Sequence, residues 1–239
     1  QGKVLLCCAT ALDDAEIEYE ASAAAPEFKE YRARVVKMEK LTHDVMRVLL
    51  KLPEGQQIRF KAGQYVNIIL DDGQRRAFSF ANPPHEDEFV ELQIRLMPGG
   101  RFTTHVFEQM KEGDEVRFEG PIGDFSLRES DRPIVFVAGA TGFAPVKSMV
   151  EDAFKRGLKR EIHLYWGVKG LKDLYLPELP TRWAREHTNF HFIPVLSEAT
   201  PEDQWSGRTG LVHEAILEDF PELKQHEIYA CGSVKMVEA

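Results

Sequence analysis

Residues 134–145 have the sequence IVFVAGATGFAP. The five apolar residues Ile134 to Ala138 predict a strand that is buried on both faces. The glycine-rich turn after them leads into a predicted helix, residues 145–156, with Pro145 at a favourable first-turn position. Such a turn lets a ligand approach N–H groups at the positive end of a helix. It is not the G-x-G-x-x-G fingerprint, and any strand-to-helix turn uses glycines, so ligand-binding and purely structural interpretations stay equally open.

Strands and helices alternate after this turn. The predicted strands are residues 161–166, 190–196 and 227–230, and the predicted helices are residues 179–186 and 211–218. This alternation predicts a parallel sheet, covered on both faces, over residues 131–239. Ligands bind such sheets at the carboxyl edge, where Cys231-Gly232-Ser233 follows the last predicted strand. A lone buried cysteine is more often a small apolar residue, so the weight of Cys231 depends on the other motifs.

Upstream of the turn, short segments alternate apolar and polar residues with period two. Six of them, separated by turn signals such as Pro53-Glu54-Gly55, predict a small antiparallel barrel over residues 27–130. They are residues 32–38, 45–52, 65–70, 76–80, 89–96 and 115–119. One predicted helix, residues 102–110, interrupts the set. The sequence thus predicts a β plus α/β architecture, in which a six-stranded antiparallel barrel precedes a parallel-sheet domain.

Two segments of the predicted barrel have residue types suited to a flavin. Arg76-Ala77-Phe78-Ser79 combines a guanidinium for phosphate, an aromatic face for a flat ring system and a hydroxyl for a ring nitrogen. Residues 99–104, GGRFTT, lead into a helix whose free N–H groups and two hydroxyls suit an anion. Taken singly, the first segment is better explained as an ordinary strand, and the second equally well as a helix cap.

Composition and charge exclude several classes of protein. The chain has 239 residues, 43% of them hydrophobic, which suits one large or two ordinary globular domains. The net charge is −9 and no Lys/Arg cluster occurs, so nucleic acid is not an expected partner. No apolar run reaches the roughly 20 residues of a membrane span, and we expect none. Three cysteines make no disulfide framework, which favours a reducing, cytoplasmic setting.

Both ends of the sequence suggest a piece of a longer protein. The first residue is Gln1, and the last residues follow a helix-like start with no stop signal. Residues 1–26 combine a strand-like segment, Val4 to Cys7, with a stretch of small residues that resembles a linker, Ala21 to Pro26. We therefore expect a domain boundary near Pro26 and a C-terminal truncation of the second domain.

Taken together and in this order, the motifs R-A-F-S, P-G-G-R-F-T-T, G-A-T-G-F-A-P, Y-W-G and Y-A-C-G resemble the ferredoxin-NADP reductase superfamily. They are similar in particular to the ferredoxin-fused NADH oxidoreductases, a branch that includes CDP-6-deoxy-glucoseen reductases and the reductase components of aromatic-ring oxygenases. The resemblance covers nearly the whole chain. It implies an FAD-binding barrel, an NAD(P)-binding domain and an enzyme that moves a hydride from NADH to FAD and passes electrons singly to an iron–sulfur centre or partner protein.

The resemblance also implies roles for the residues of the motifs. Arg76 would contact the FAD pyrophosphate and Phe78, a tyrosine in most family members, would lie against the flavin. Ser79 and Cys231 would be the catalytic residues, Ser79 tuning flavin N5 and Cys231 shaping the nicotinamide pocket. Further cofactor contacts are expected from Ala77, Asn82, Gln93, Arg95, Gly100, Thr103 and Thr104 on the FAD side, and from Gly139, Thr141, Gly142, Ala144, Pro145, Tyr165, Trp166, Gly167 and Gly232 on the nucleotide side.

The segment Gly2 to Ala9 is similar to the end of a plant-type ferredoxin domain. Cys7 matches the fourth ligand of the [2Fe–2S] cluster in such a domain. The cluster needs four thiolates, and besides Cys7 this sequence contains just Cys8 and Cys231. We therefore expect the cluster in the intact parent protein and no metal in this chain.

The residue after Ser197 bears on which nicotinamide nucleotide the protein uses. Glu198, which follows Ser197, favours NADH over NADPH, because a carboxylate repels a 2′-phosphate and can bond a ribose hydroxyl. The expected partners are NADH and a redox partner protein or a fused ferredoxin domain. The alternatives are a free flavin reductase, which binds flavin as a substrate and has no iron–sulfur partner, and a non-catalytic binding scaffold.

Overall fold

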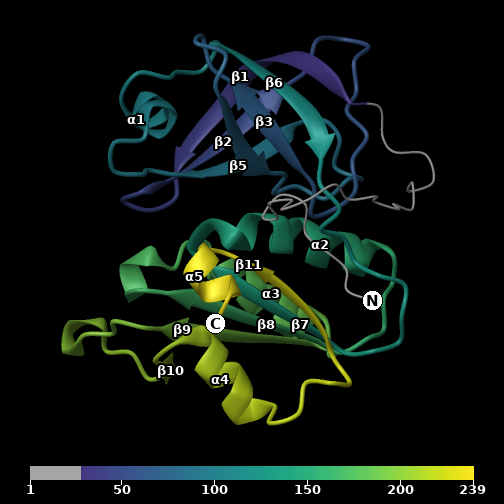
Figure 1. Ribbon diagram of the computed structural model, residues 1–239, viewed down its shortest axis with the longest axis vertical. Coiled ribbons are helices and arrows are strands. Elements are labelled where there is room, and N and C mark those ends of the chain that lie inside the picture. Colours follow the sequence, from purple (N-terminus) through teal and green to yellow (C-terminus); the bar gives the residue numbers. More distant parts are fainter. Residues whose placement is uncertain (1–27) are drawn as a thin grey trace, which may run out of the picture.

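The computed structural model describes residues 28–239, which form two β-sheets with a helix between them (Figure 1). The first sheet has six strands and the second has five. No helix within the described range has the length and apolar character to cross a membrane. The predictions for Cys7 and for the linker at residues 21–26 lie outside the described residues.

The first sheet is antiparallel, and its strands are in the order β4-β3-β6-β1-β2-β5. Along β1, Tyr31, Ala33 and Val35 are buried, which is the alternation expected of a strand with one face in a core. The edge strands meet where the Ala81 N–H donates to the Glu91 carbonyl at 2.9 Å, although no ladder pairs β4 with β5 in residues 28–239. The six strands are β1 (Lys29–Lys40), β2 (Val45–Lys51), β3 (Tyr65–Ile69), β4 (Arg75–Ser79), β5 (Val90–Arg95) and β6 (Glu115–Ile122).

The second sheet is parallel, with its strands in the order β10-β9-β8-β7-β11. They are β7 (Ile134–Gly139), β8 (Ile162–Val168), β9 (Phe190–Leu196), β10 (Arg208–Thr209) and β11 (Glu227–Cys231). The two-residue β10 was not predicted, because a segment this short has no measurable period. The fold class predicted from the sequence, an antiparallel β unit followed by a parallel-sheet α/β unit, is confirmed.

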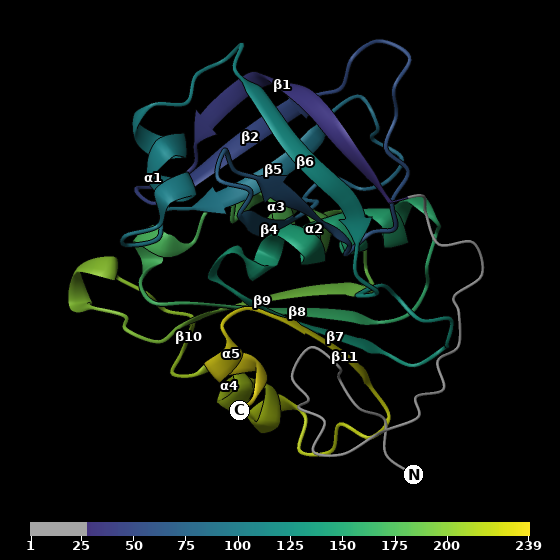
Figure 2. The same ribbon diagram turned by 45° about the horizontal axis from the view of Figure 1, so that its top comes forward.

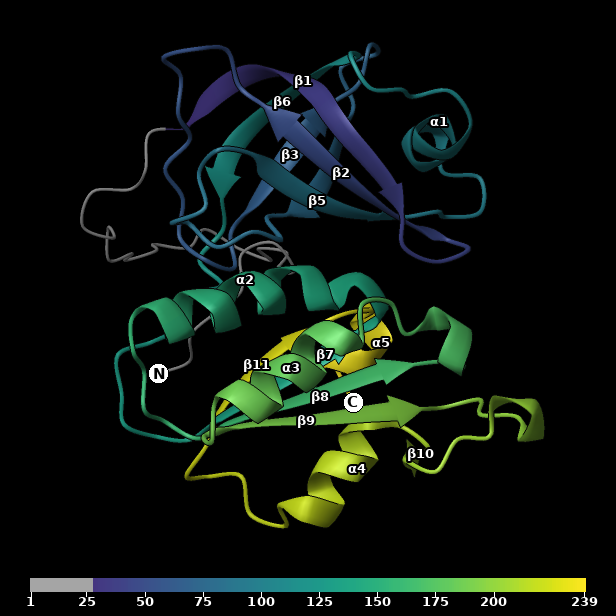
Figure 3. The ribbon, with the colours of Figure 1, turned by 180° about the vertical axis from the view of Figure 1, so that it is seen from behind.

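Helices cover both faces of the parallel sheet (Figures 2 and 3). Alternate residues of β7 point to opposite faces, so Phe136 packs in the core under α2 and α3, whereas Val137 packs in the core beside α4. The helices are α1 (Arg101–Glu108), which interrupts the first sheet, and α2 (Phe143–Lys155), α3 (Glu178–Glu186), α4 (Val212–Asp219) and the short α5 (Val234–Val237). Three 3-10 turns, η1 (Ala140–Gly142), η2 (Leu171–Asp173) and η3 (Pro201–Asp203), lie at the carboxyl edge of the sheet or in its loops.

Helix α2 contacts both sheets. Its Lys147 ammonium donates to the Ala81 carbonyl at 3.0 Å, and its Ser148 hydroxyl donates to the Asn82 carbonyl at 2.8 Å. Both side chains are buried. Because buried polar groups that lose a partner are costly, these bonds hold the two sheets in one relative arrangement.

Candidate active site

A cavity of about 760 Å³ lies between the two sheets. Strands β4 and β5 and the start of α1 form one side, and the carboxyl ends of β7, β8 and β11 form the other. The carboxyl edge of an open parallel sheet is where ligands bind such folds, and the volume is in the usual range for a small-molecule site.

Most of the predicted site residues line this one cavity. They come from segments that are far apart in the sequence, and the fold brings them together. On the antiparallel side they are Arg76, Ala77, Phe78, Ser79, Gln93, Arg95, Gly100 and Thr103, and on the parallel side they are Gly139, Thr141, Gly142, Ala144, Gly167, Cys231 and Gly232.

Arg76 is an exposed residue of β4 that lines the cavity, and it has no acidic partner within residues 28–239. Its guanidinium donates to the Arg75 carbonyl at 2.8 Å and to the Gln74 amide oxygen at 2.6 Å, both of which are neutral. Arg75 differs, since its guanidinium binds the Glu119 carboxylate at 2.6 Å. An arginine that has neutral acceptors keeps its full charge for an anion, and phosphate is the anion that a guanidinium fork fits.

The start of α1 is built by Gly100 and Thr103. Gly100 is the N-cap residue, and a Cβ there would lie 2.5 Å from the Thr103 hydroxyl oxygen. This hydroxyl accepts from the Met97 N–H and donates to the Gly100 carbonyl, both at 3.1 Å. The hydroxyl of Thr103 therefore holds the turn in place. The first N–H groups of the helix have no partner within the helix and can donate to an anion. Thr104, the second predicted hydroxyl, does not line the cavity.

The turn between β7 and α2 lies against the end of β11. A Cβ on Gly142 would lie 2.0 Å from the Cys231 carbonyl oxygen, and one on Gly139 would lie 2.6 Å from the Met236 sulfur. The predicted helix start at Pro145 is two residues late, because η1 passes directly into α2 at Phe143. The glycines thus permit a close backbone contact between two strand ends, as well as access to the cavity.

Cys231 lines the cavity with a half-buried side chain. Burial raises the pKa of this thiol above its ordinary value, so the neutral form prevails near pH 7. A neutral thiol is a weak nucleophile, and this geometry suits a residue that shapes the pocket.

Gln93 is a cavity residue that both sheets hold in place. The Tyr175 hydroxyl, from the loop after η2, donates to its amide oxygen at 2.8 Å, and its amide nitrogen donates to Glu91 at 3.1 Å. Glu91 also lies 3.5 Å from the Lys147 ammonium and 3.3 Å from Arg47. Tyr175 is fully buried, which raises the pKa of its hydroxyl and keeps it a neutral donor. The Gln93 amide consequently has one fixed orientation.

Five predicted residues lie outside the cavity lining: Asn82, Thr104, Pro145, Tyr165 and Trp166. Tyr165 points to the α4 face, where its hydroxyl donates to Asp219 at 2.7 Å. Trp166 points to the other face and stacks on Phe143 with ring centroids 3.9 Å apart. Alternate residues of a strand point to opposite faces, which separates these two rings. Of this motif, Gly167, one residue before the end of β8, lines the cavity. Asn82 binds the backbone of its own loop.

The cavity also includes residues that the motifs did not indicate. Val168 ends β8, Lys169 follows it, and Met97 precedes the start of α1. Phe102, which lies within the GGRFTT segment but was given no role, lines the cavity too. Lys169 could have been found from the rule that strand ends of a parallel sheet meet at one edge. Ser197, already named with Glu198 for the cofactor preference, lines the cavity at the same edge. The Lys169 ammonium pairs with Glu198 at 2.9 Å, and both side chains are exposed.

Two family models match separate parts of the chain, one over the first sheet and one over the second. Residues 32–127 match an oxidoreductase FAD-binding domain, and residues 136–239 match an oxidoreductase NAD-binding domain. The chain is 39% identical to the CDP-6-deoxy-L-threo-D-glycero-4-hexulose-3-dehydrase reductase of Yersinia pestis, over 100% of its own length and 72% of the relative. It is also 39% identical to terephthalate 1,2-dioxygenase, reductase component 1, of a Comamonas species, over 99% of its length and 71% of the relative.

A solved structure is similar as well. The crystal structure of the Amycolatopsis cytochrome P450 reductase GcoB superposes with a TM-score of 0.85 at 36% sequence identity. The match covers 92% of this chain and 67% of that one.

Proposed function

The chain belongs to the ferredoxin-NADP reductase superfamily of FAD- and NAD-binding oxidoreductases, and on this basis we propose that it is the NADH-dependent reductase of a multicomponent redox system. It is a flavoprotein reductase that moves electrons from a nicotinamide nucleotide through FAD to a redox partner. The relatives named above serve a dehydrase and a dioxygenase by name, which supports a partner of that kind.

The residues of the cavity fit an FAD group beside a nicotinamide. No carboxylate of the described part of the chain pairs with Arg76, and the start of α1 supplies N–H groups, so the two together suit a diphosphate. The glycines at positions 139, 142 and 167 leave the carboxyl edge of the parallel sheet without side-chain bulk. When bound, FAD accepts a hydride from the nicotinamide and releases electrons one at a time.

The protein contributes positioning and exclusion of water. We assign the diphosphate to Arg76 and the first turn of α1, the flavin ring to Phe78 and Ser79, and the nicotinamide side to Gly142 and Cys231. The Ser79 hydroxyl can donate a hydrogen bond to the edge of the flavin ring. The Cys231 thiol stays neutral near pH 7, so it occupies space in the pocket and takes no part in proton transfer. No strong acid or base is required, because a hydride transfer between two cofactors needs alignment.

One observation carries the proposal: Arg76 and Ser79 of one sheet line the same cavity as Gly142 and Cys231 of the other. The test is the absorption spectrum of the purified protein, followed by NADH addition with ferricyanide as acceptor. We expect a yellow protein with one FAD per chain that NADH bleaches in the absence of the acceptor. Retention of no flavin, with turnover of added free flavin, would favour a free flavin reductase, and failure to oxidise NADH with FAD present would favour a scaffold.

We further propose that NADH is preferred over NADPH. Ser197 lines the cavity, and Glu198 beside it pairs with Lys169 across the ends of β8 and β9. A carboxylate at this place repels a 2′-phosphate, although the exposed pair is partly screened by water. Paired measurements of kcat/KM with both nucleotides test this, and a higher value for NADPH contradicts it.

We propose that the electron acceptor is an iron–sulfur centre, either on a partner protein or in a fused ferredoxin domain, and that the protein works in the cytoplasm. The similarity of residues 2–9 to the end of a plant-type ferredoxin supports the first point, and the scarcity of cysteines supports the second.

A further inference from the structure

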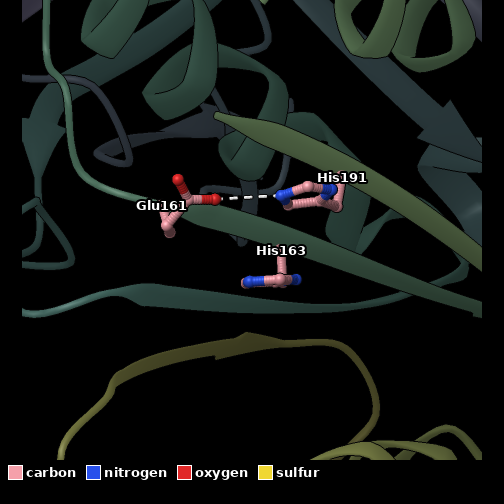
Figure 4. A group of neighbouring side chains, drawn as sticks. All are labelled: Glu161, His163 and His191. Carbon is pink, nitrogen blue, oxygen red and sulfur yellow. Dashed lines mark hydrogen bonds and ion pairs between the residues drawn. The ribbon is translucent and has the colours of Figure 1, made fainter. Parts of the chain in front are cut away.

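Glu161, His163 and His191 form a polar cluster that the proposed reaction does not use (Figure 4). His163 of β8 and His191 of β9 are directly paired in the parallel ladder. Glu161, two residues before His163, shares its face of the sheet. Three side chains that can bind a metal ion are thereby placed together by the register of two strands.

The cluster lies at the opposite edge of the sheet from the cofactor cavity. It is at the beginning of β8 and β9, whereas the cavity takes in Gly167 and Ser197 at their ends. With a rise of about 3.3 Å per residue, His163 and Gly167 are about 13 Å apart along β8. A ligand bound at the cluster would therefore touch neither the flavin nor the nicotinamide.

The potential ligand atoms are already close. One nitrogen or oxygen from each residue lies within 4.8 Å of the others, and the Glu161 carboxylate is 2.9 Å from His191 Nε2. The two imidazole rings are stacked, with centroids 4.6 Å apart and an angle of 18° between their planes. In Figure 4 each ring presents one nitrogen on the side where Glu161 lies.

To bind one ion together, the three side chains must rotate slightly from their present positions. A tetrahedral Zn²⁺ holds its nitrogen and oxygen ligands at about 2.0–2.2 Å, so two ligand atoms are about 3.4 Å apart. Parallel rings cannot both aim a lone pair at one ion, and at least one of them must turn. His191 and Glu161 are 46% and 52% exposed, so solvent leaves room for them to turn, whereas half-buried His163 packs edge-on against Phe220. His163 is thus the fixed ligand and the other two are adjustable.

We propose that His163, His191 and Glu161 bind one divalent transition-metal ion of the zinc class, with water completing its coordination. Two imidazoles and one carboxylate are the ligand types that Zn²⁺, Cu²⁺ and Ni²⁺ prefer, whereas Mg²⁺ and Ca²⁺ prefer oxygen ligands alone. The ion joins β8 to β9 far from the reacting groups, so its effect is on the stability of the folded chain. The competing explanation is a plain His191–Glu161 ion pair that binds no metal.

The test measures binding of Zn²⁺ to the metal-free chain by equilibrium dialysis, and of Cu²⁺ by electron paramagnetic resonance. We expect one Zn²⁺ per chain, and a Cu²⁺ spectrum with hyperfine splitting from two nitrogens. His191→Ala should weaken Zn²⁺ binding by more than about tenfold and leave one coupled nitrogen. The matched control is His105→Ala, which removes an exposed histidine on α1 and should change neither result. His163→Gln and Glu161→Gln provide second variants of the cluster.

Thermal unfolding provides an independent measurement. Zn²⁺ should raise the Tm of the unmodified chain and of His105→Ala but not that of His191→Ala, each compared with the same protein free of metal. The proposal is overturned if Zn²⁺ binds His191→Ala as tightly as the unmodified chain, as it would through the thiols. The same holds if no stoichiometric binding occurs at submillimolar free Zn²⁺.

Discussion

Arg76 and Arg75 are neighbours on β4 with different chemistry. Arg75 neutralises Glu119, and its hydrogen bond, working against burial, holds the pKa of that carboxyl below its ordinary value. Arg76 has neutral partners and lines the cavity. The family resemblance singled out Arg76, through the R-A-F-S motif, and gave Arg75 no role. Arg75 is thus held by a carboxylate, and the proposed phosphate contact falls to Arg76.

We predict that Arg76→Ala weakens FAD binding far more than it slows hydride transfer in the FAD-loaded fraction. A lost bidentate contact to phosphate corresponds to about 1.5–3 kcal/mol, or roughly 10- to 150-fold in the dissociation constant of FAD. Equilibrium dialysis gives the occupancy and rapid mixing with NADH gives the rate. Arg117→Ala, which removes an exposed partner of Glu30, is the control. Equal occupancy in all three proteins contradicts the assignment.

Tyr175 acts on the site through Gln93. In Tyr175→Phe the buried amide oxygen of Gln93 has no hydroxyl to accept from, which costs about 1–3 kcal/mol of unfolding free energy. A free amide can also turn, so the flavin absorption maximum should shift, which a purely structural role would not produce. Urea unfolding and the visible spectrum measure the two effects, and a variant equal to the unmodified chain in both contradicts the role.

At the scale of single elements, the turn between β7 and α2 depends on the absence of a side chain at Gly142. In Gly142→Ala the new Cβ would lie 2.0 Å from a backbone oxygen of β11, which cannot rotate away. We expect a loss of about 1–3 kcal/mol or more in unfolding free energy, together with weaker nucleotide binding. In the control Gly170→Ala the nearest atom is 3.8 Å from the new Cβ, so stability should change little. Equal stability of the two variants contradicts this.

Strand β11 is fastened by an ion pair between Glu227 and Arg160 at 2.7 Å. Burial alone would raise the pKa of Glu227, but hydrogen bonds from Arg160, Tyr229 and Ser130 hold it below its ordinary value of 4.5. The unfolded chain then binds more protons in acid. The stabilisation is therefore complete above pH 4.5 and is lost as the pH falls through the folded-state pKa.

We predict that Glu227→Gln lowers the unfolding free energy at pH 7 by about 1–3 kcal/mol. The difference from the unmodified chain should shrink as the pH falls below 4.5, because Glu227 then becomes protonated. Urea titrations across this range measure it. A difference that stays constant with pH would show that the pair contributes through shape alone.

Helices and strands could be predicted where the apolar residues repeat at a regular spacing within one short segment. Both ends of β9 were predicted correctly, and the bounds of the six strands of the first sheet were predicted to within a few residues. In these strands apolar and polar residues alternate between neighbouring positions, which the sequence shows directly. The start of α2 was missed by two residues, since a glycine-rich 3-10 turn has no apolar period. Tyr165 and Trp166 were named from a motif, and it is their strand geometry that directs them into two cores.

At the scale of the whole molecule, the contacts between the sheets lay beyond sequence reasoning. Lys147 and Ala81 are 66 positions apart, and no local pattern joins them. The boundaries predicted at residues 26 and 130 stay predictions. The sequence did supply most of the motif residues that the cavity brings together, because each motif is a run of neighbouring positions.

Lys147 is the residue on which the arrangement of the two sheets depends most. It is buried and contacts the carboxylates of Glu91 and Glu151. In Lys147→Met, Glu151 loses its cation and Glu91 keeps only Arg47, at 3.3 Å, among the described residues. Glu151, whose pKa burial already raises, is then protonated more readily. Breaking a buried pair costs about 3–5 kcal/mol, and we expect a loss of that order in unfolding free energy at pH 7.

The pH dependence has a definite sign. A raised folded-state pKa means that the folded chain binds the proton more tightly, so lowering the pH should recover part of the stability of Lys147→Met. Calorimetry at pH 7 and pH 5.5 measures this, with Lys155→Met, at the end of the same helix, as the control. A loss below about 1 kcal/mol would be typical of an exposed pair and contradicts the role.

The bonds from α2 to the first sheet have a consequence for recombination. Lys147 and Ser148 contact two main-chain carbonyls there, at Ala81 and Asn82, which any amino acid provides. Glu91 is the acceptor in that sheet that depends on residue identity. Chimeras that join halves of different homologues at residues 123–133 should hence be compatible where a lysine at position 147 is inherited with a carboxylate at position 91. Parents for such chimeras can be chosen by these two positions.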